Sequence, residues 1–295
     1  MIPGAAGSGA MDPVQRIIIK TQASDLPMLK DRYPFLYLEH GRLEIDDASV
    51  KWISAEYEIF RIPAAVISTL LLGPGTSVTH EAVKVLAELN CTVCWVGEDS
   101  LRFYAVGETP TANTRNFKRQ MQLAADPKAS LEVARKMFSS RFPDEDLSSK
   151  TLRELMLWEG SRVQMLYAQL AQKYFVAWRG RMYKPGEFKL SDLTNQLITS
   201  ANVALYALVL SIIHSLGLSP HIGFIHSGSP LPFVYDVADL YKADLVFEPA
   251  FALTAKMCGR YDRTLAISEF RRRVIEFGLL KKCPADITEL LGLKK

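Results

Sequence analysis

Gly107-Glu108-Thr109-Pro110-Thr111-Ala112-Asn113 divides the sequence into two parts with different hydrophobic patterns. A proline among polar residues is typical of a linker. Before this stretch, apolar residues come in short runs closed by turn residues, which is the pattern of β-strands. After it, apolar residues recur with the 3.6-residue period of helices. The sequence therefore predicts an α+β protein, with a small β-rich domain followed by a mostly α-helical one.

The first part, residues 25–106, is predicted to be a β-sandwich-like domain with one short helix. Residues 79–89 have the apolar spacing of that helix. The runs that favour strands are residues 35–45 around His40-Gly41, 56–62, 66–72, 91–96 and 101–106. Residues 1–24 are expected to form a flexible tail, because residues 1–13 are mostly small and lack the basic start and apolar core of a signal peptide.

The second part begins after the predicted linker of residues 107–113 and covers residues 114–295. The segments with helical periodicity are residues 114–125, 127–142, 149–176, 194–216 and 268–280. Residues 175–183, around Arg179-Gly180, favour a short hairpin. Residues 279–295 are expected to form a short helical tail that contacts a partner.

The composition is that of an ordinary globular protein. The chain has 295 residues, of which 48% are hydrophobic and 23% charged, and this excludes intrinsic disorder. The formal net charge of +3 is too small to indicate nucleic-acid binding by the whole chain. However, residues 1–108 have 9 Lys and Arg against 14 Asp and Glu, whereas residues 109–295 have 26 against 18. This division favours an anionic partner on the second domain.

Two features bear on location. Residues 193–235 contain no charged side chain, but the polar residues within residues 197–218 favour a buried helix over a membrane span. The four cysteines are too few for a disulfide framework, so free thiols in the cytoplasm are expected. Cys91 and Cys94 have C-x-x-C spacing, but no second pair and no nearby histidine accompany them. Two packed thiols are therefore favoured over a zinc or redox site.

Glu159 is a carboxylate on the apolar face of a predicted helix. It lies one turn from Leu155 and one turn from Val163. A carboxylate in such a place is costly unless it is paired or bound to a metal ion. A salt bridge to a buried arginine and a metal site both account for it.

His226, Asp236 and Asp239 are the other candidates. His226 lies in Gly223-Phe224-Ile225-His226-Ser227-Gly228, a loop where a hydrogen-bonded structural histidine is the simpler interpretation. Asp236 and Asp239 are three residues apart and would share one helix face, although Asp236 could be an N-terminal cap. Together with Glu159 they form an oxygen-rich set with one imidazole, which suits Mg²⁺ or Mn²⁺ better than zinc. Such an ion can act on a phosphodiester.

Three motifs, taken together, resemble those of one family. They are Trp158-Glu159-Gly160-Ser161-Arg162, the loop of residues 223–228, and Phe233-Val234-Tyr235-Asp236-Val237-Ala238-Asp239. In this order and spacing, residues 26–275 resemble the CRISPR-associated spacer-acquisition integrase, and its type I-E branch above all. Further similar stretches are residues 72–76, Cys94-Trp95-Val96-Gly97-Glu98 followed by Arg102, and residues 135–142.

The resemblance implies a β domain and a helical catalytic domain that holds one divalent metal ion, Mg²⁺ or Mn²⁺. Glu159, His226 and Asp239 match the family's metal ligands, and Asp236 matches an acidic position that supports the catalytic site. The implied reaction is transesterification, in which the 3′-hydroxyl of a captured double-stranded DNA fragment attacks a phosphodiester at the edge of a CRISPR repeat. Hydrolytic nicking, an endonuclease activity, is a related outcome.

The resemblance also implies partners. The family works as homodimers bridged by a small dimeric CRISPR-associated adaptation protein, on leader and repeat DNA and without a membrane. Lys84, Arg102, Arg181 and Tyr206 match DNA-contact positions. Each basic side chain could instead be a surface charge, and Tyr206 could pack in the core.

Three positions depart from the family's pattern. Ser77 and Ser229 stand where relatives carry basic residues, and His40 stands where relatives carry an aromatic one. These changes concern the contacts to the DNA ends and leave the metal site intact. Two other functions stay open on the sequence: a non-catalytic DNA-binding scaffold with a structural acidic cluster, and a branched-DNA nuclease in repair.

Overall fold

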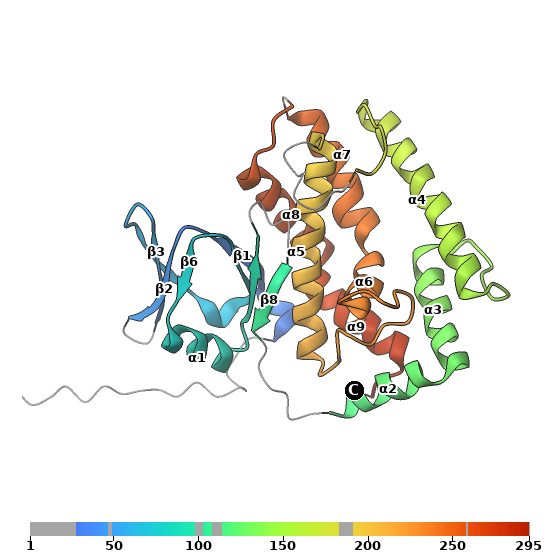
Figure 1. Ribbon diagram of the computed structural model, residues 1–295, viewed down its shortest axis with the longest axis horizontal. Coiled ribbons are helices and arrows are strands. Elements are labelled where there is room, and N and C mark those ends of the chain that lie inside the picture. The colour runs from blue at the N-terminus through green and yellow to red at the C-terminus, as the bar shows by residue number, and fades with distance from the viewer. Residues whose placement is uncertain are drawn as a thin grey trace, which may run out of the picture.

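The computed structural model describes residues 28–46, 49–97, 103–107, 114–182, 191–257 and 259–294. A β-rich amino-terminal region is followed by a helical region, which confirms the predicted α+β class (Figure 1). The two regions lie side by side, with the sheets to the left of the helices in Figure 1. The predicted tail of residues 1–24 and residues 108–113 of the predicted linker lie outside the described residues.

One four-stranded sheet, sheet A, faces the helical region. Its strands, in spatial order, are β1 (Tyr33–Leu38), β5 (Ile67–Leu72), β7 (Thr92–Val96) and β8 (Phe103–Gly107). The first three are parallel, and β8 is antiparallel to β7. Every residue of β5 is buried, as expected of a central parallel strand covered on both faces.

A second four-stranded sheet, sheet B, shares a core with the other face of sheet A. Its strands, in spatial order, are β4 (Ile59–Ile62), β3 (Ser49–Ser54), β2 (Gly41–Asp46) and β6 (Thr76–Val78). Leu43, Trp52 and Leu70 meet in this core, which α1 (His80–Glu88) also covers. The hydroxyl of Thr79 caps α1 by accepting the N–H of Ala82. Short 3₁₀ turns occur at Leu29–Asp31 and Ala64–Val66.

The turn at His40-Gly41 is a corner between the sheets. The predicted strands on its two sides exist, but β1 pairs with β5 while β2 pairs with β3 and β6. His40 has a φ of 52°, in the left-handed region. A Cβ atom on Gly41 would lie 2.4 Å from the carbonyl oxygen of Ile53, so only glycine fits there.

The helical region surrounds one long central helix, α5 (Leu193–Ser215). The other helices are α2 (Arg115–Ala125), α3 (Pro127–Arg141), α4 (Leu152–Tyr174), α6 (Pro232–Asp239), a π-helical turn (Ala243–Phe247), α7 (Glu248–Lys256), α8 (Arg263–Phe277) and α9 (Leu279–Leu291). By length and composition α5 could cross a membrane. However, 78% of its most apolar stretch is buried inside the fold, as predicted for a core helix.

Sheet A and α5 share a continuous core. Phe35, Leu71 and Cys94 of the sheet belong to the same apolar cluster as the buried face of α5. Hydroxyl groups also join the two regions, because Ser211 on α5 accepts from Thr92 at 3.0 Å and lies 3.3 Å from Ser68. The β-rich and helical regions are therefore packed as one body.

One prediction for the helical region is wrong. Residues 175–182, the described part of the predicted hairpin, contain no strand. The predicted tail of residues 279–295 is helical as far as Leu291, and α9 packs Leu279, Cys283 and Ile287 into the chain's own core. Its contact with a partner stays a prediction. The thiols of Cys91 and Cys94 are free and buried, as predicted.

Candidate active site

Asp236 anchors the loop that carries His226. It lies inside α6 and is buried, so its interpretation as a helix cap is wrong. Its carboxylate accepts the backbone N–H groups of Phe224, Ile225 and His226 at 2.6, 3.1 and 2.9 Å. A Cβ atom on Gly223 would lie 2.8 Å from Oδ2 of Asp236, so glycine is required for this close approach. The loop is therefore fixed by a single buried side chain.

His226 is oriented by the same carboxylate. Its Nδ1 atom lies 2.8 Å from Oδ1 of Asp236, and its Nε2 atom points toward Oδ2 of Asp239 at 3.7 Å. The hydrogen bond with Asp236 and the charge of Asp239 raise the pKa of His226, although burial opposes them. A carboxylate that holds one ring nitrogen of a histidine leaves the other available as a metal ligand.

Asp239 lies between His226 and Lys242. Its Oδ1 atom is 2.5 Å from Nζ of Lys242, one helical turn further along the chain. Burial alone would raise the pKa of Asp239, but the charges of Lys242, Arg141 and His226 lower it. Asp239 is therefore held as a carboxylate, the form that binds a cation.

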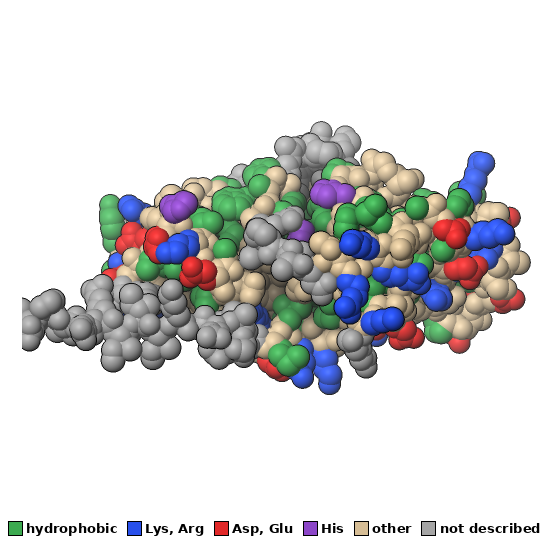
Figure 2. Space-filling view, turned by 90° about the horizontal axis from the view of Figure 1, so that it is seen from below, with side chains coloured by type: hydrophobic (Ala, Val, Ile, Leu, Met, Phe, Trp, Pro, Cys, Tyr) green, Lys and Arg blue, Asp and Glu red, His purple; other side chains and the backbone are tan. Residues whose placement is uncertain are grey.

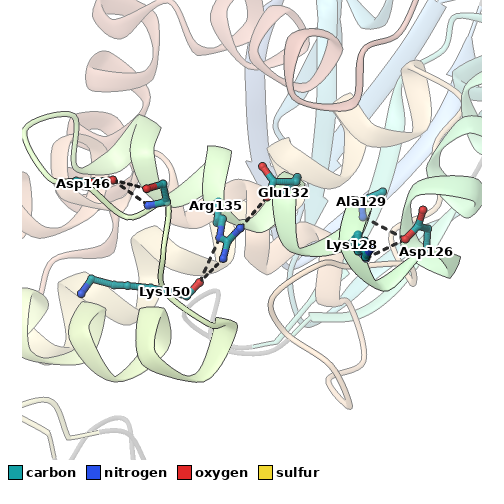
Figure 3. Close-up of polar contacts among 8 residues, drawn as sticks. Asp126, Lys128, Ala129, Glu132, Arg135, Asp146 and Lys150 are labelled. Carbon is teal, nitrogen blue, oxygen red and sulfur yellow. Dashed lines mark hydrogen bonds and ion pairs between the residues drawn. The ribbon is translucent and has the colours of Figure 1, made fainter.

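Polar contacts fix α3 to the segment that leads into α4 (Figure 3). Asp126 caps α3 by accepting two backbone N–H groups of its first turn. The guanidinium of Arg135 donates to the carbonyl oxygen of Lys150 at 2.9 Å and pairs with Glu132 at 2.7 Å. Since Lys150 directly precedes the cap of α4, these contacts fix the start of α4 relative to α3.

Glu159 lies in α4 and pairs with Arg141, the last residue of α3. The side chains are only 16% and 11% exposed. The guanidinium of Arg141 also lies 5.2 Å from the ring centre of Phe142 and 5.9 Å from that of Phe138. The salt bridge to a buried arginine, one of the two interpretations of Glu159, is thus present in the structure.

The residues present fit a hard divalent cation by donor type. Glu159, His226 and Asp239 offer two carboxylates and one imidazole whose Nε2 faces a carboxylate. In the described part of the chain, however, no three such side chains are close enough together to hold an ion. Arg141 contacts Glu159 and lowers the pKa of Asp239, so it supplies part of the positive charge that these carboxylates need.

A cavity of about 360 Å³ lies beside His226. Its lining residues are Arg181, Thr199, Asn202, Val203, Tyr206, His226, Tyr235 and Lys242. Arg181 is held in place by Asn195 at 2.7 Å and by Thr199 at 2.8 Å. Two cations and two phenol rings thus border the candidate site, a combination suited to a phosphate and a flat ring.

The structure places two of the four predicted DNA-contact residues at the cavity. Arg181 and Tyr206 line the cavity. Lys84 is exposed on α1 in the β-rich region and pairs with Glu81 at 3.0 Å. Arg102 lies outside the described residues.

Three residues at the site were not predicted from the sequence. Lys242 and Tyr235 border the cavity, and Arg141 pairs with Glu159. The spacing could have indicated the position of Lys242, because a lysine three residues after Asp239 lies on the same helix face. Arg141 lies within residues 135–142, a stretch that resembles the family, but the sequence did not single it out as a site residue.

Basic side chains gather on one face of the helical region. Figure 2 shows lysine and arginine side chains close together on the face seen from below, where α2 lies. The exposed basic residues of α2 and the start of α3 are Arg115, Lys118, Arg119 and Lys128. In α2 no acidic residue offsets them, as expected of a surface that meets a polyanion.

Relatives of the chain share nearly its whole length. The sequence profile of the family described as "CRISPR associated protein Cas1" matches residues 35–145 and 143–262. The CRISPR-associated endonuclease Cas1 2 of Chlorobaculum tepidum is 57% identical over 280 residues, which are 95% of each chain. The CRISPR-associated endonuclease Cas1 of Escherichia coli is 37% identical over 240 residues, covering 81% of this chain and 79% of the relative.

Solved structures have the same fold. TtCas1 in its crystal structure with DNA gives a TM-score of 0.78 at 37% identity, covering 88% of this chain and 92% of that one. A Cas1 protein from Thermotoga maritima gives 0.75 over 88% and 97% of the two chains, and at 15% identity it shows the fold alone. By sequence and by fold, this chain belongs to the Cas1 family of CRISPR-associated endonucleases.

Proposed function

We propose that this chain is a divalent-metal-dependent DNA integrase and endonuclease of CRISPR adaptation, which joins the 3′-hydroxyl ends of captured double-stranded DNA fragments into the repeat array. The observation that carries the proposal is His226, held by Asp236 and facing Asp239 beside a cavity lined by Arg181 and Lys242. The crystal structure of a relative, TtCas1, in complex with DNA supports DNA as the substrate.

The residues that would hold Mg²⁺ or Mn²⁺ are Glu159, His226 and Asp239. The bound ion would stabilise the charge that develops on the phosphate and on the leaving oxygen. Asp236 keeps the Nε2 atom of His226 turned toward Asp239.

The basic side chains of the cavity would position the DNA. Arg181 and Lys242 would contact phosphates near the reacting end, which positions the strand without reading its sequence. The 3′-hydroxyl forms a bond to phosphorus as the bond from phosphorus to the displaced 3′-oxygen breaks. Because DNA supplies the nucleophile, the hydroxyl of Ser227 is not required.

The finer assignments belong to the same proposal. Motif resemblance over residues 26–275 supports the type I-E branch, a homodimer and the small dimeric adaptation protein as partner. The proposal also includes two domains, residues 25–106 and 114–295, joined by a linker. It further includes a cytoplasmic location.

One observation favours a second candidate function. The ion pair of Glu159 with Arg141 satisfies this largely buried carboxylate without a metal ion. A DNA-binding scaffold with a structural acidic cluster would contain the same pair.

Strand transfer decides between these functions. A labelled duplex fragment is incubated with a plasmid bearing a leader and repeat, with Mn²⁺ or Mg²⁺, with and without the small partner. We expect metal-dependent joined product, and at least a hundredfold loss in Glu159→Gln, His226→Ala and Asp239→Asn. His221→Ala is the matched control, because His221 is exposed and contacts the carbonyl of Pro230.

Three outcomes separate the candidates. Joining that persists in two of the three site variants would rule out the metal-ligand assignment. Tight DNA binding without joining, with the partner present and with lower thermal stability of the variants, would favour the scaffold. Cleavage of branched DNA that ignores repeat sequence and needs no partner would favour the repair nuclease.

A further inference from the structure

Gln120 is a completely buried amide on α2, and the proposed chemistry gives it no role. The buried residues of α2 are Gln120 and Leu123, and the rest of the helix is exposed or half-buried. A glutamine without access to water needs partners inside the protein for its two N–H groups and its oxygen. The partners of Gln120 therefore show what this position is for.

The side-chain amide of Gln120 holds the turn that joins α5 to the His226 loop. Its Nε2 atom donates to the carbonyl oxygens of Ser219 and Ile222 at 2.9 and 2.8 Å. Its Oε1 atom accepts the N–H of Ser219 at 2.8 Å. All three hydrogen bonds go to backbone atoms, so Gln120 fixes the course of the chain itself. The turn of residues 219–222 leads directly into Gly223, where the His226 loop begins.

The position of this turn is passed on to His226, because Gly223 fits without spare room. A Cβ atom on Gly223 would lie 2.7 Å from Cβ of Pro232 and 2.8 Å from Oδ2 of Asp236. The three N–H groups that follow Gly223 all donate to Asp236. The loop is thus held at two points, by Gln120 before the glycine and by Asp236 after it.

The turn has one further backbone link, to α6. The N–H of Phe233 donates to the carbonyl oxygen of Pro220 at 3.1 Å. This bond joins the turn to the helix that carries Asp236 and Asp239, whereas the bonds of Gln120 join it to α2. Loss of the glutamine would leave the turn with this single link, so the loop that follows it would be less well fixed.

We propose that Gln120 is a positioning residue for His226. By fixing the backbone of residues 219–222, it sets where the imidazole of His226 stands relative to Asp239, whose Oδ2 atom lies 3.7 Å from Nε2 of the histidine. The inference rests on the proposed function, in which these two side chains hold the metal ion. A functional side chain has to be held within about 0.5 Å of its productive position, so a looser loop slows the reaction.

The first test needs neither metal nor DNA. Gln120→Met keeps the length of the side chain and removes all three hydrogen bonds. We expect the N–H groups of residues 222–226 to exchange with deuterium at least tenfold faster, measured by NMR well below the melting temperature, while those of α5 keep their wild-type rates. Leu123→Ala is the matched control, because it weakens the packing of the same helix without touching the turn. In this control the loop should exchange within about twofold of the wild type.

Gln120→Glu is a milder second variant, which also keeps the proposal testable if Gln120→Met does not fold. Burial and the two carbonyl oxygens favour its neutral carboxyl form, which accepts one hydrogen bond and donates one. It should therefore rescue part of the effect, and its loop should exchange at a rate between those of the wild type and Gln120→Met.

The second test is the rate of strand transfer with Mn²⁺. We expect Gln120→Met to lower kcat at least tenfold and to leave KM for the DNA fragment within about twofold, because the DNA-binding side chains are unchanged. Leu123→Ala should keep both values within about twofold. A purely structural glutamine would lower the melting temperature and leave both the loop exchange and the kcat of the folded protein unchanged.

Loop exchange at the wild-type rate in a folded Gln120→Met would overturn the proposal, and so would an unchanged kcat. The two readouts also keep this result apart from the proposed function. Metal-dependent joining that Gln120→Met leaves unchanged rejects the role of Gln120 and leaves the integrase standing. Faster exchange confined to the loop, with no joining by the wild type, supports the hold of Gln120 on the loop and rejects the integrase.

Discussion

Arg141 and Glu159 form a largely buried ion pair that joins the last residue of α3 to the first half of α4. The pair puts a protein cation beside a carboxylate proposed to bind a metal ion. The charge of Arg141 also lowers the pKa of Asp239, so its effect reaches a second proposed ligand. A divalent ion bound as proposed would therefore compete with Arg141 for the same negative charge.

Removing this competitor should strengthen metal binding. We expect Arg141→Gln to bind Mn²⁺ roughly tenfold more tightly than the wild type, because Glu159 loses its internal cation. Free Mn²⁺, followed by its electron paramagnetic resonance signal, measures the affinity without DNA or turnover. Arg141→Lys keeps the charge and should stay close to the wild type. Weaker Mn²⁺ binding by a folded Arg141→Gln would mean that the arginine supports the ion instead of replacing it.

Asp236 should be required for the shape of the His226 loop. Asp236→Asn cannot accept all three backbone N–H groups and the ring nitrogen, and a buried donor left unpaired costs about 1–3 kcal/mol. Urea unfolding should show that loss of stability, and strand transfer should fall with it. Gly223→Ala is a second route to the same defect, because its new Cβ would press on Asp236 and Pro232. Unchanged stability in both variants would disprove the anchoring role.

The stability of the fold should decrease at acid pH, because a carboxylate caps the start of α4. Thr151 and Glu154 form a capping box there, and the N–H and hydroxyl of Thr151 lower the pKa of Glu154. A carboxyl group with a lowered folded pKa stabilises the fold above its unfolded pKa, about 4.3, and loses that effect as the pH falls through the folded value.

Glu154→Ala should therefore melt at a lower temperature than the wild type from pH 7 to about pH 5, and the difference should shrink below about pH 4. Scanning calorimetry across this range checks the prediction. Glu56→Ala, which changes an exposed glutamate in the turn after β3, is the matched control. A difference that stays constant down to pH 3 would show that the carboxylate form does not matter.

The cysteine thiols should be unreactive in the folded protein. Burial raises the pKa of Cys91 and of Cys283 to about 12 and that of Cys94 further. In a Cys258→Ser variant, which removes the cysteine outside the described residues, a disulfide reagent at pH 8 should label none of the three until urea is added. Rapid labelling of Cys91 and Cys94 in the native state would revive the redox interpretation of their spacing.

The order and approximate bounds of several helices and strands could be predicted, because apolar periodicity is a local property of the sequence. The strand of β5 and the helices α3 and α5 lie within a few residues of their predicted ranges. The assignment of β1 and β2 to different sheets could not be predicted, since it depends on pairing partners 30 or more residues away. The prediction of a hairpin at residues 175–183 was wrong, because a glycine between short apolar runs occurs equally often in an irregular loop.

The candidate site could be predicted only in part. Glu159, His226 and Asp236 stand out because each puts a polar group in an apolar setting, and the structure supplies a partner for each. Their roles as metal ligands or supports stay predictions. The pairing of Glu159 with one particular arginine depends on how α3 and α4 pack. No pattern along the chain encodes that packing.

The position of sheet A against α5 has a consequence for the order of synthesis. Released alone, α5 would expose a 23-residue apolar helix long enough to enter a lipid bilayer. The strands β1, β5, β7 and β8 all precede it in the chain, so the ribosome has completed the sheet that covers one side of α5 before α5 emerges. Moving the β-rich region to the carboxyl end by circular permutation would reverse this order. The permuted chain should then aggregate or associate with membranes during translation, even though its finished fold is the same.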